Sequence, residues 1–97
     1  MVGCYVDVEN RVFNHYEEMV DGNLWTPDTC ITACAGFAHA GVEFHGAECW
    51  CGLEVESPDK YGSSSDCADG LGSDWAIDIY TVPDGIFHCF YIPTKKS

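Results

Sequence analysis

The fold is decided by residues 41–52, GVEFHGAECWCG, taken together with residues 29–34, TCITAC. The first stretch is typical of two short strands on either side of a glycine-containing turn. Along the second of these strands, period-two alternation directs Cys49 and Cys51 to one face of a sheet and Trp50 to the other. The two thiols on that face therefore need partners on a facing element.

A helix predicted over residues 27–37 supplies that facing element. Thr26 is a good N-cap, a proline suits the first helical position, and Asp28 favours the positive end of the helix. Cys30 and Cys34 are four residues apart, so their side chains lie on one face of the helix. The pattern places two helix thiols opposite two strand thiols.

The rest of the chain is predicted to form strands and loops. Residues 11–20 indicate either a strand or an irregular segment that covers the sheet. A long polar loop over residues 54–72 is pinned by Cys67. Strands are expected at residues 2–8, 41–44, 48–52 and 75–82, and a turn at Pro83-Asp84-Gly85 leads to a last strand at residues 86–92, which completes a C-terminal hairpin.

The cysteine content indicates the cellular compartment. Seven cysteines occur in 97 residues, which is typical of small secreted domains that need disulfides to stabilise a limited core. Zinc is the competing explanation, but zinc sites use repeated Cys-x-x-Cys-like pairs or add closely spaced histidines. The four histidines here are scattered along the chain. We therefore expect disulfides, no metal and no cofactor, in a secreted or extracellular protein.

The charge of the chain excludes several classes of partner. Four basic residues stand against 16 acidic ones, for a net charge of −12. Nucleic acids and anionic lipids attract Lys and Arg, so we expect the chain to bind no nucleic acid and no membrane. The sequence has no apolar run approaching the roughly 18 residues of a transmembrane helix. No signal peptide is visible, so in a secreted protein Met1 is expected to stand where a leader was removed.

Several motifs follow one another along the chain. Gly3-Cys4-Tyr5 is followed by Thr29-Cys30-x3-Cys34, by Gly41-Val42-Glu43-Phe44, by Glu48-Cys49-Trp50-Cys51-Gly52 and by Asp66-Cys67, and a closing strand ends at Tyr80. This ordered set resembles the WSC domain. The resemblance covers residues 3–82 and leaves residues 83–97 as a C-terminal strand extension and tail.

The resemblance implies a small, disulfide-rich α+β fold similar to the PAN/apple type, in which an antiparallel sheet packs on one helix. It also implies three disulfides, Cys4–Cys67, Cys30–Cys49 and Cys34–Cys51. Geometry alone does not choose between the last two pairs and the nested alternative, in which Cys30 pairs with Cys51 and Cys34 with Cys49. Both arrangements therefore remain open at this point.

Cys89 falls outside the family pattern. Relatives usually carry two more cysteines between the position of Cys67 and the closing strand, and this chain has none there. Six cysteines have implied partners, which leaves Cys89 over. It is either a buried thiol that packs as a small hydrophobic group or one half of an intermolecular disulfide. The second interpretation predicts a homodimer through Cys89 or the C-terminal strand.

The resemblance further implies binding of polysaccharide, typically fungal cell-wall glucan. The residues add a physical reason, because sugar sites combine aromatic faces with a few polar groups, and this chain has five Tyr, five Phe and three Trp. Trp50 is the leading candidate because its ring points away from the helix, unless residues 11–20 cover it. Trp75 follows a glycine-containing loop and is either exposed for binding or an anchor for the final hairpin.

Three polar residues complete the candidate site. Glu43 and Glu48 flank the predicted turn and can accept hydrogen bonds from sugar hydroxyls, and His45 lies in the turn itself. As structural alternatives, Glu48 is a solvated edge residue and Glu43 bonds to the backbone. A carboxylate pair also fits a glycosidase, but a 97-residue chain tied by three bridges has little room for a deep cleft. No Ser-His-Asp or Cys-His arrangement is legible, so we expect no enzyme.

The acidic residues at positions 66, 69, 74 and 78 raise the question of calcium, but they lack the spacing of an EF-hand loop. The favoured function is a noncatalytic, cell-wall-associated module that binds β-glucan or a related polysaccharide. The alternative is a structural or self-associating protein-interaction module, such as the outer portion of a cell-wall sensor.

Overall fold

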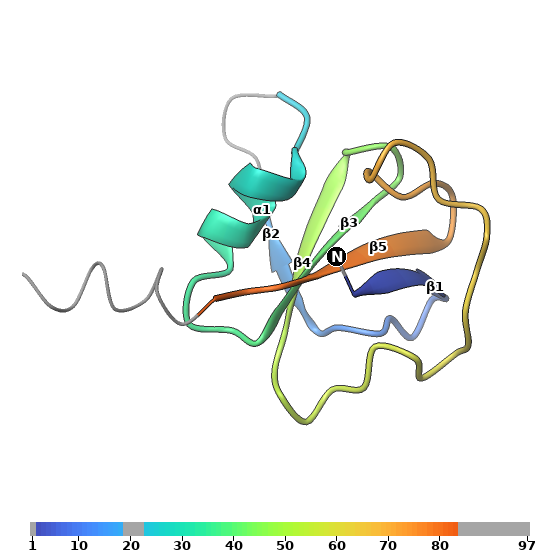
Figure 1. Cartoon of the computed structure of the whole chain (residues 1–97), viewed down its shortest axis with the longest axis horizontal. Helices are drawn as coiled ribbons and strands as arrows, with labels where there is room; N and C mark the ends of the chain where they lie inside the picture. Colours follow the sequence, from blue (N-terminus) through green and yellow to red (C-terminus); the bar gives the residue numbers. More distant parts are fainter. Residues whose placement is uncertain (1, 19–22, 84–97) are drawn as a thin grey trace, which may run out of the picture.

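The computed structural model describes residues 2–18 and 23–83 (Figure 1). Its centre is a five-stranded antiparallel sheet with the strand order β1-β5-β3-β4-β2. The strands are β1 (Gly3–Val6), β2 (His15–Glu17), β3 (His39–Glu43), β4 (Glu48–Gly52) and β5 (Ala76–Thr81). In the described part of the chain, the one helix is α1 (Pro27–Ala33), which packs against one face of the sheet. The predicted α+β class is confirmed.

Helix α1 begins where the sequence predicts. The hydroxyl of Thr26 accepts a hydrogen bond from the backbone N–H of Thr29 at 3.1 Å, and Thr29 Oγ1 accepts one from the N–H of Thr26 at 2.9 Å. This reciprocal pair is a capping box. The prediction was wrong at the other end: the helix stops at Ala33 instead of Phe37, and the chain then turns through Gly36, whose φ of 93° lies in the left-handed region.

The strands follow the predicted pattern with shifted ends. Strand β4 has the predicted bounds. Strand β3 begins at His39 rather than Gly41 and ends at Glu43, because Phe44 and His45 both have a φ of 55° and start the turn. Strands β1 and β5 are shorter than predicted at both ends.

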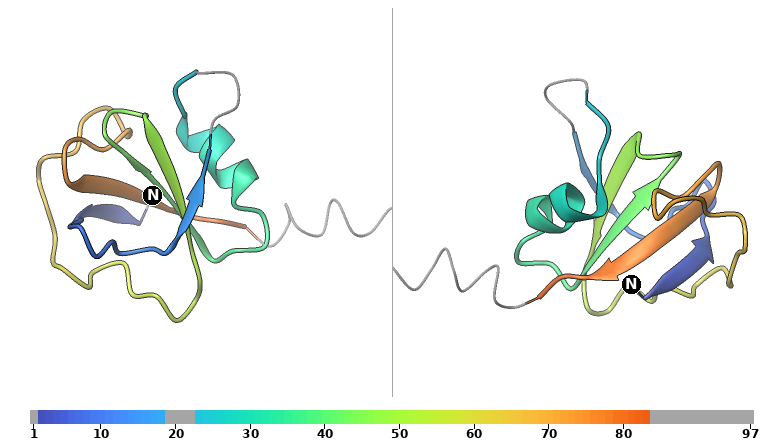
Figure 2. Two further views of the ribbon diagram at one scale, coloured as in Figure 1. Left: turned by 180° about the vertical axis from the view of Figure 1, so that it is seen from behind. Right: turned by 45° about the horizontal axis from the view of Figure 1, so that its top comes forward.

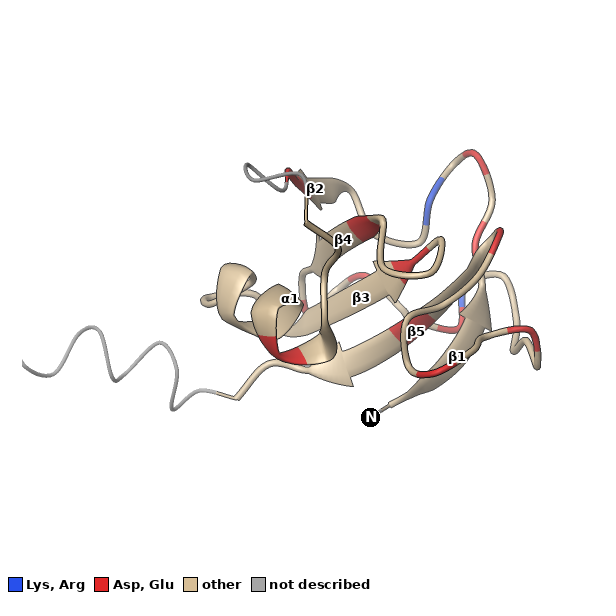
Figure 3. Cartoon of the chain, turned by 90° about the horizontal axis from the view of Figure 1, so that it is seen from above, with Lys and Arg blue, Asp and Glu red and all other residues tan. Residues whose placement is uncertain are grey.

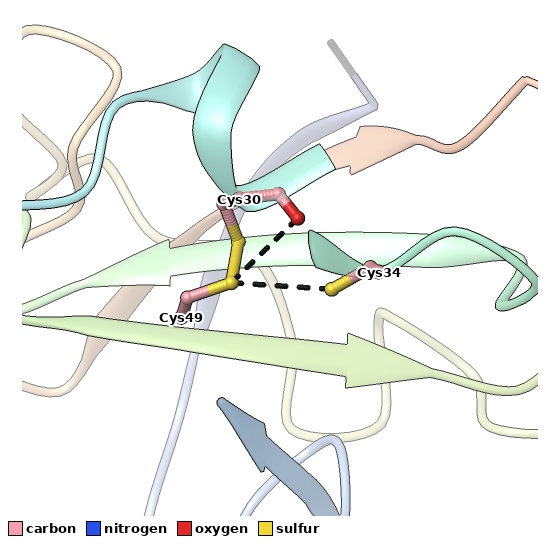
Figure 4. Close-up of side chains that lie close together, drawn as sticks. All are labelled: Cys30, Cys34 and Cys49. Carbon is pink, nitrogen blue, oxygen red and sulfur yellow. Dashed lines mark hydrogen bonds between the residues drawn. A yellow bond between two sulfur atoms is a disulfide. The ribbon is translucent and has the colours of Figure 1, made fainter. Parts of the chain in front are cut away.

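Three disulfides join the sheet to the segments around it. They are Cys30–Cys49 and Cys34–Cys51, which connect α1 to β4, and Cys4–Cys67, which connects β1 to the long loop before β5. These are the pairs that the resemblance implies, and the nested alternative does not occur. Figure 4 shows the first bridge with Cys34 beside it, its sulfur 3.9 Å from that of Cys49. These sulfurs are all bonded in bridges, so none is a thiolate available to a metal.

The sheet carries a hydrophobic cluster on each face. On the α1 side the buried residues are Trp25, Cys30, Cys34, Ala40, Val42, Cys49, Cys51 and Val82. On the opposite side, Val12 and Phe13 pack against Ile77 and Ile79 of β5. The Phe13 ring fits because Gly52 has no side chain, and a Cβ there would overlap the ring.

The segment predicted as either a strand or an irregular cover over residues 11–20 contains both in its described part. Its first part is irregular and covers the sheet through Val12 and Phe13, and a short later part forms β2 at the sheet edge. Figure 2 shows this connection from behind, between β1 and β2.

Two further sequence predictions lie outside the described residues, namely the last strand at residues 86–92 and the state of Cys89. Acidic residues are spread over strands, loops and the start of α1 (Figure 3). Within residues 2–18 and 23–83, no helix has the length and apolar character needed to cross a membrane.

Candidate functional site

A single arginine gathers three carboxyl groups on the face of the sheet away from α1. Arg11 Nη1 donates to Asp7 Oδ2 at 3.2 Å, to Glu43 Oε1 at 3.3 Å and to Glu48 Oε1 at 3.2 Å. The three acceptors come from the segment after β1, from the end of β3 and from the start of β4. We call Arg11, Asp7, Glu43 and Glu48 the Arg11 cluster.

The same guanidinium lies against aromatic rings. The distance from Arg11 Cζ to the ring centroid is 4.6 Å for Trp50, 4.9 Å for Trp75 and 5.9 Å for Phe44. These distances lie within the range in which a cation is attracted to the face of an aromatic ring. Tyr16 adds a fourth ring, with its centroid 4.9 Å from that of Trp50. We call Tyr16, Phe44, Trp50 and Trp75 the aromatic surface.

Strand alternation places Trp50 on this surface. Cys49 and Cys51 are fully buried under α1, so the side chain between them points to the other face. Trp50 pairs directly with Tyr16 in the register of β2 and β4. The indole is partly covered, since it packs against the buried cluster of Val12 and Phe13 on this face of the sheet. Its Nε1 donates to Glu48 Oε1 at 3.0 Å.

Trp75 is exposed, with 43% of its surface accessible. Its φ of 59° is uncommon for a bulky residue, and such backbone positions concentrate at functional sites. The ring meets Phe44 edge-on at 5.4 Å. Its carbonyl accepts a hydrogen bond from the backbone N–H of Asp7 at 3.0 Å, which ties the residue before β5 to the segment after β1. Within the described residues the side chain of Trp75 is therefore partly exposed to solvent, and the second strand of the predicted final hairpin lies outside those residues.

An open pocket lies next to Trp75. It has a volume of about 550 Å³ and is lined by residues 6–10 together with Trp75. This volume lies within the usual range for small-molecule sites. Two of its lining residues, Glu9 and Asn10, are exposed and polar. The pocket therefore combines one aromatic wall with hydrogen-bonding groups.

Glu43 differs from the sequence expectation. Its side chain has no exposed surface, so it cannot contact a glycan at the surface of the protein. Burial raises its pKa from 4.5 to about 9, and the neighbouring carboxyl of Asp7 adds to the rise. The Glu43 carboxyl is therefore protonated at neutral pH. Glu43 is buried because it lies in β3, between β4 and β5. Its carboxyl accepts a hydrogen bond from Arg11 and so helps to hold this side chain in place.

The other polar candidates have separate positions. Glu48 is partly exposed and belongs to the Arg11 cluster. His45 is exposed in the turn between β3 and β4, and no hydrogen bond or ring contact among the described residues joins it to the cluster. Of the four acidic residues considered for calcium, Asp78 is buried and accepts from the backbone N–H of Gly72 at 3.0 Å. Burial raises the pKa of Asp78, which is a structural residue of β5.

Sequence reasoning missed Asp7, Arg11 and Tyr16. The isolated charge of Arg11 was the available signal, because it is one of four basic residues in a chain with 16 acidic ones. A lone arginine in such a chain is expected to collect carboxylates.

Comparison with known protein families supports the motif pattern. The WSC domain family model matches residues 1–70, a range that contains β1 to β4, α1 and all six bridged cysteines. No curated protein gives a significant match to the chain. WSC domains are noncatalytic, carbohydrate-binding modules of extracellular proteins. With this match and its three disulfides, the chain belongs to the WSC domain family.

Proposed function

We propose that the domain binds an extracellular cell-wall polysaccharide, β-glucan or a related glycan, through the aromatic surface. The observation that carries this proposal is the pair of indoles, the partly exposed Trp50 and the exposed Trp75, which both lie against Arg11 on the sheet face away from α1. Flat aromatic faces suit the apolar C–H side of sugar rings, and nearby carboxylates accept hydrogen bonds from hydroxyls.

The spacing of the indoles supports one extended ligand. Both rings lie within 5 Å of the same Arg11 carbon, so their centres are separated by roughly 10 Å at most. A single stretch of glycan can contact both rings. Glu48, beside Trp50, and the open pocket, beside Trp75, supply polar groups at the two ends of this stretch.

The carboxyl groups support a binding role instead of glycoside hydrolysis. Glycosidases place two carboxyl groups on either side of the scissile bond. Here Glu43 and Glu48 both accept from the same nitrogen of Arg11, and Glu43 is fully buried. A sugar cannot enter between them without displacing the guanidinium.

A retention experiment tests the proposal. The protein and its Trp50→Ala and Trp75→Ala variants are incubated with insoluble β-glucan, xylan and chitin, and the bound fraction is measured. We expect wild-type retention on at least one polysaccharide and a loss of affinity of about tenfold or more for each variant, which equals about 1.4 kcal/mol.

The matched control is Val55→Ala, which truncates an exposed apolar side chain that lies outside the aromatic surface. This variant should be retained like the wild type, and far-UV circular dichroism should show that all variants are folded. Failure of the wild type to bind any of the three polysaccharides would contradict the proposal.

Self-association is the second candidate function. Six of the seven cysteines pair with one another, so Cys89 is the cysteine left for a bond between two chains. Mass measurement without reductant tests this candidate: a dimer mass that Cys89→Ser abolishes supports it. A monomer mass with one alkylatable thiol contradicts a covalent dimer.

A further inference from the structure

Arg11 contacts both tryptophans and is also connected to each of them by a short chain of hydrogen bonds. Toward Trp50, Glu48 Oε1 accepts from Arg11 Nη1 at 3.2 Å and from Trp50 Nε1 at 3.0 Å. Toward Trp75, the Asp7 side chain accepts from Arg11 at 3.2 Å, and the Asp7 backbone N–H donates to the Trp75 carbonyl at 3.0 Å. Arg11 is thus connected to the Trp50 indole both by its ring contact and through Glu48, and to Trp75 by a ring contact and, through Asp7, at the backbone.

We propose that Arg11 is a positioning residue, which sets the spacing and orientation of Trp50 and Trp75 for a glycan that stacks on them. This inference rests on the proposed function, because it explains how that surface is held in place. Arg11 itself acts through the two indoles.

The burial of the partners supports a positioning role. The side chains of Asp7 and Glu43 are 1% and 0% exposed, and that of Arg11 is 22% exposed. Nη1 therefore points into the protein, where its hydrogen bonds are strengthened by the low local dielectric. Removing the guanidinium would leave the buried Asp7 Oδ2 and Glu43 Oε1 without this donor, so we expect the cluster to rearrange when Arg11 is replaced.

The chemistry also requires arginine in particular. A guanidinium is planar, so it can lie against aromatic rings with its face while it donates to carboxylates along its edge. A lysine ammonium keeps the charge but has no flat face and no fork of donors. Lysine at this position is therefore expected to restore the charge balance without restoring the indole geometry.

The backbone conformation around Arg11 gives a further reason for a positioning residue at this place. Arg11 has a φ of 38°, and Trp75 and Phe44, whose rings lie against its guanidinium, have φ values of 59° and 55°. All three backbones are therefore in the left-handed region. That region is costly for residues other than glycine, and such positions persist when surrounding contacts hold them. The hydrogen bonds and ring contacts of Arg11 are surrounding contacts that can hold these backbone conformations.

The test compares Arg11→Met and Arg11→Lys with wild type and with Lys60→Met as the matched control. Lys60 is the other basic residue in the described ranges, and its ammonium lies over Tyr61 at 5.3 Å. Each variant is measured for affinity toward the polysaccharide that retains the wild type. Near-UV circular dichroism and acrylamide quenching of tryptophan fluorescence are measured on the free protein. Trp25 is buried, so quenching reports Trp50 and Trp75.

We expect Arg11→Met to lose at least tenfold in affinity, with a changed near-UV spectrum and stronger quenching, while far-UV circular dichroism and the oxidised mass stay as in wild type. Arg11→Lys should fold and show the same changes to a smaller degree. Lys60→Met should match wild type in every measurement.

Two results would overturn the inference. One is unchanged affinity in Arg11→Lys, or in a folded Arg11→Met. The other is a loss of affinity with unaltered tryptophan spectra, because Arg11 would then contact the glycan directly. Both results require a wild type that binds, so they are distinct from failure of the proposed function, in which the wild type itself is not retained.

Discussion

At the scale of single residues, the pKa of the buried Glu43 carboxyl lies far above its ordinary value. Burial first, and then Asp7, raise the pKa of Glu43 from 4.5 to about 9. At neutral pH Glu43 therefore contributes a neutral carboxyl to the Arg11 cluster. The Asp7 and Glu43 side chains are buried, and a second ionised carboxylate in this buried position would add negative charge that one guanidinium does not compensate, which is costly.

This protonation predicts how stability depends on pH. The folded protein keeps a proton on Glu43 that the unfolded chain releases above pH 4.5. The contribution of Glu43 to the free energy of unfolding is therefore complete below pH 4.5 and is lost as the pH rises toward 9. Glu43→Gln resembles the protonated acid and does not titrate, so its free energy of unfolding should decline less than that of wild type between about pH 5 and pH 8.

Urea unfolding across this pH range measures the difference. Glu54→Gln, which removes an exposed carboxyl, is the control and should follow the wild-type curve. Parallel curves for Glu43→Gln and wild type would show that Glu43 is ionised in the folded protein.

At the scale of elements, β4 links the stabilising bridges to the candidate site. Period-two alternation was enough to predict both of its faces, because side-chain direction along a strand depends on local geometry alone. Strand β2 was harder to predict, since it has three residues and lies at the sheet edge, where its pairing with β4 decides its place. The C-terminal end of α1 was missed because Gly36 ends the helical path earlier than the periodicity implied.

The capping box of α1 gives a prediction at this scale. Thr26→Ala removes the acceptor for the N–H of Thr29, so we expect a loss of about 1 kcal/mol in the free energy of unfolding. Thr32→Ala changes an exposed threonine inside the same helix and should cause no loss. Denaturant unfolding of both variants checks the expectation, and equal stabilities would mean that the disulfides alone hold the start of α1.

At the scale of the whole molecule, the Cys4–Cys67 bridge connects segments far apart in the chain. It spans 63 residues and fastens the long loop before β5 to β1. Strand β5 lies between β1 and β3, so this bridge also limits how the chain can return to pair beside β1 in the sheet. The other two bridges span 19 and 17 residues and act locally between α1 and β4.

Removal of the long bridge should therefore weaken the whole fold. In the chain-entropy account, closing a loop of this length contributes about 4 kcal/mol. We expect a Cys4→Ser, Cys67→Ser double variant to lose stability of this order in guanidinium unfolding, with the remaining two disulfides verified by mass. An unchanged unfolding midpoint would show that β1 and the loop are held by packing alone.

By itself, the sequence determined the features that depend on local spacing. Capping over a few residues determined the start of α1. Periodicity determined the bounds of β4, the outward direction of Trp50 and the cysteines by which α1 and β4 face each other. The motif order also placed the chain in its family.

Only the tertiary structure decided which of the candidate residues act together. Asp7, Arg11 and Trp75 reach Glu48 and Trp50 from distant segments, and their meeting depends on strand order, which no local pattern encodes. The burial of Glu43 likewise comes from its place between β4 and β5. Contacts of this kind follow from the packing of the whole chain, and for that reason the arginine at the centre of the surface was visible in the sequence only as an isolated charge.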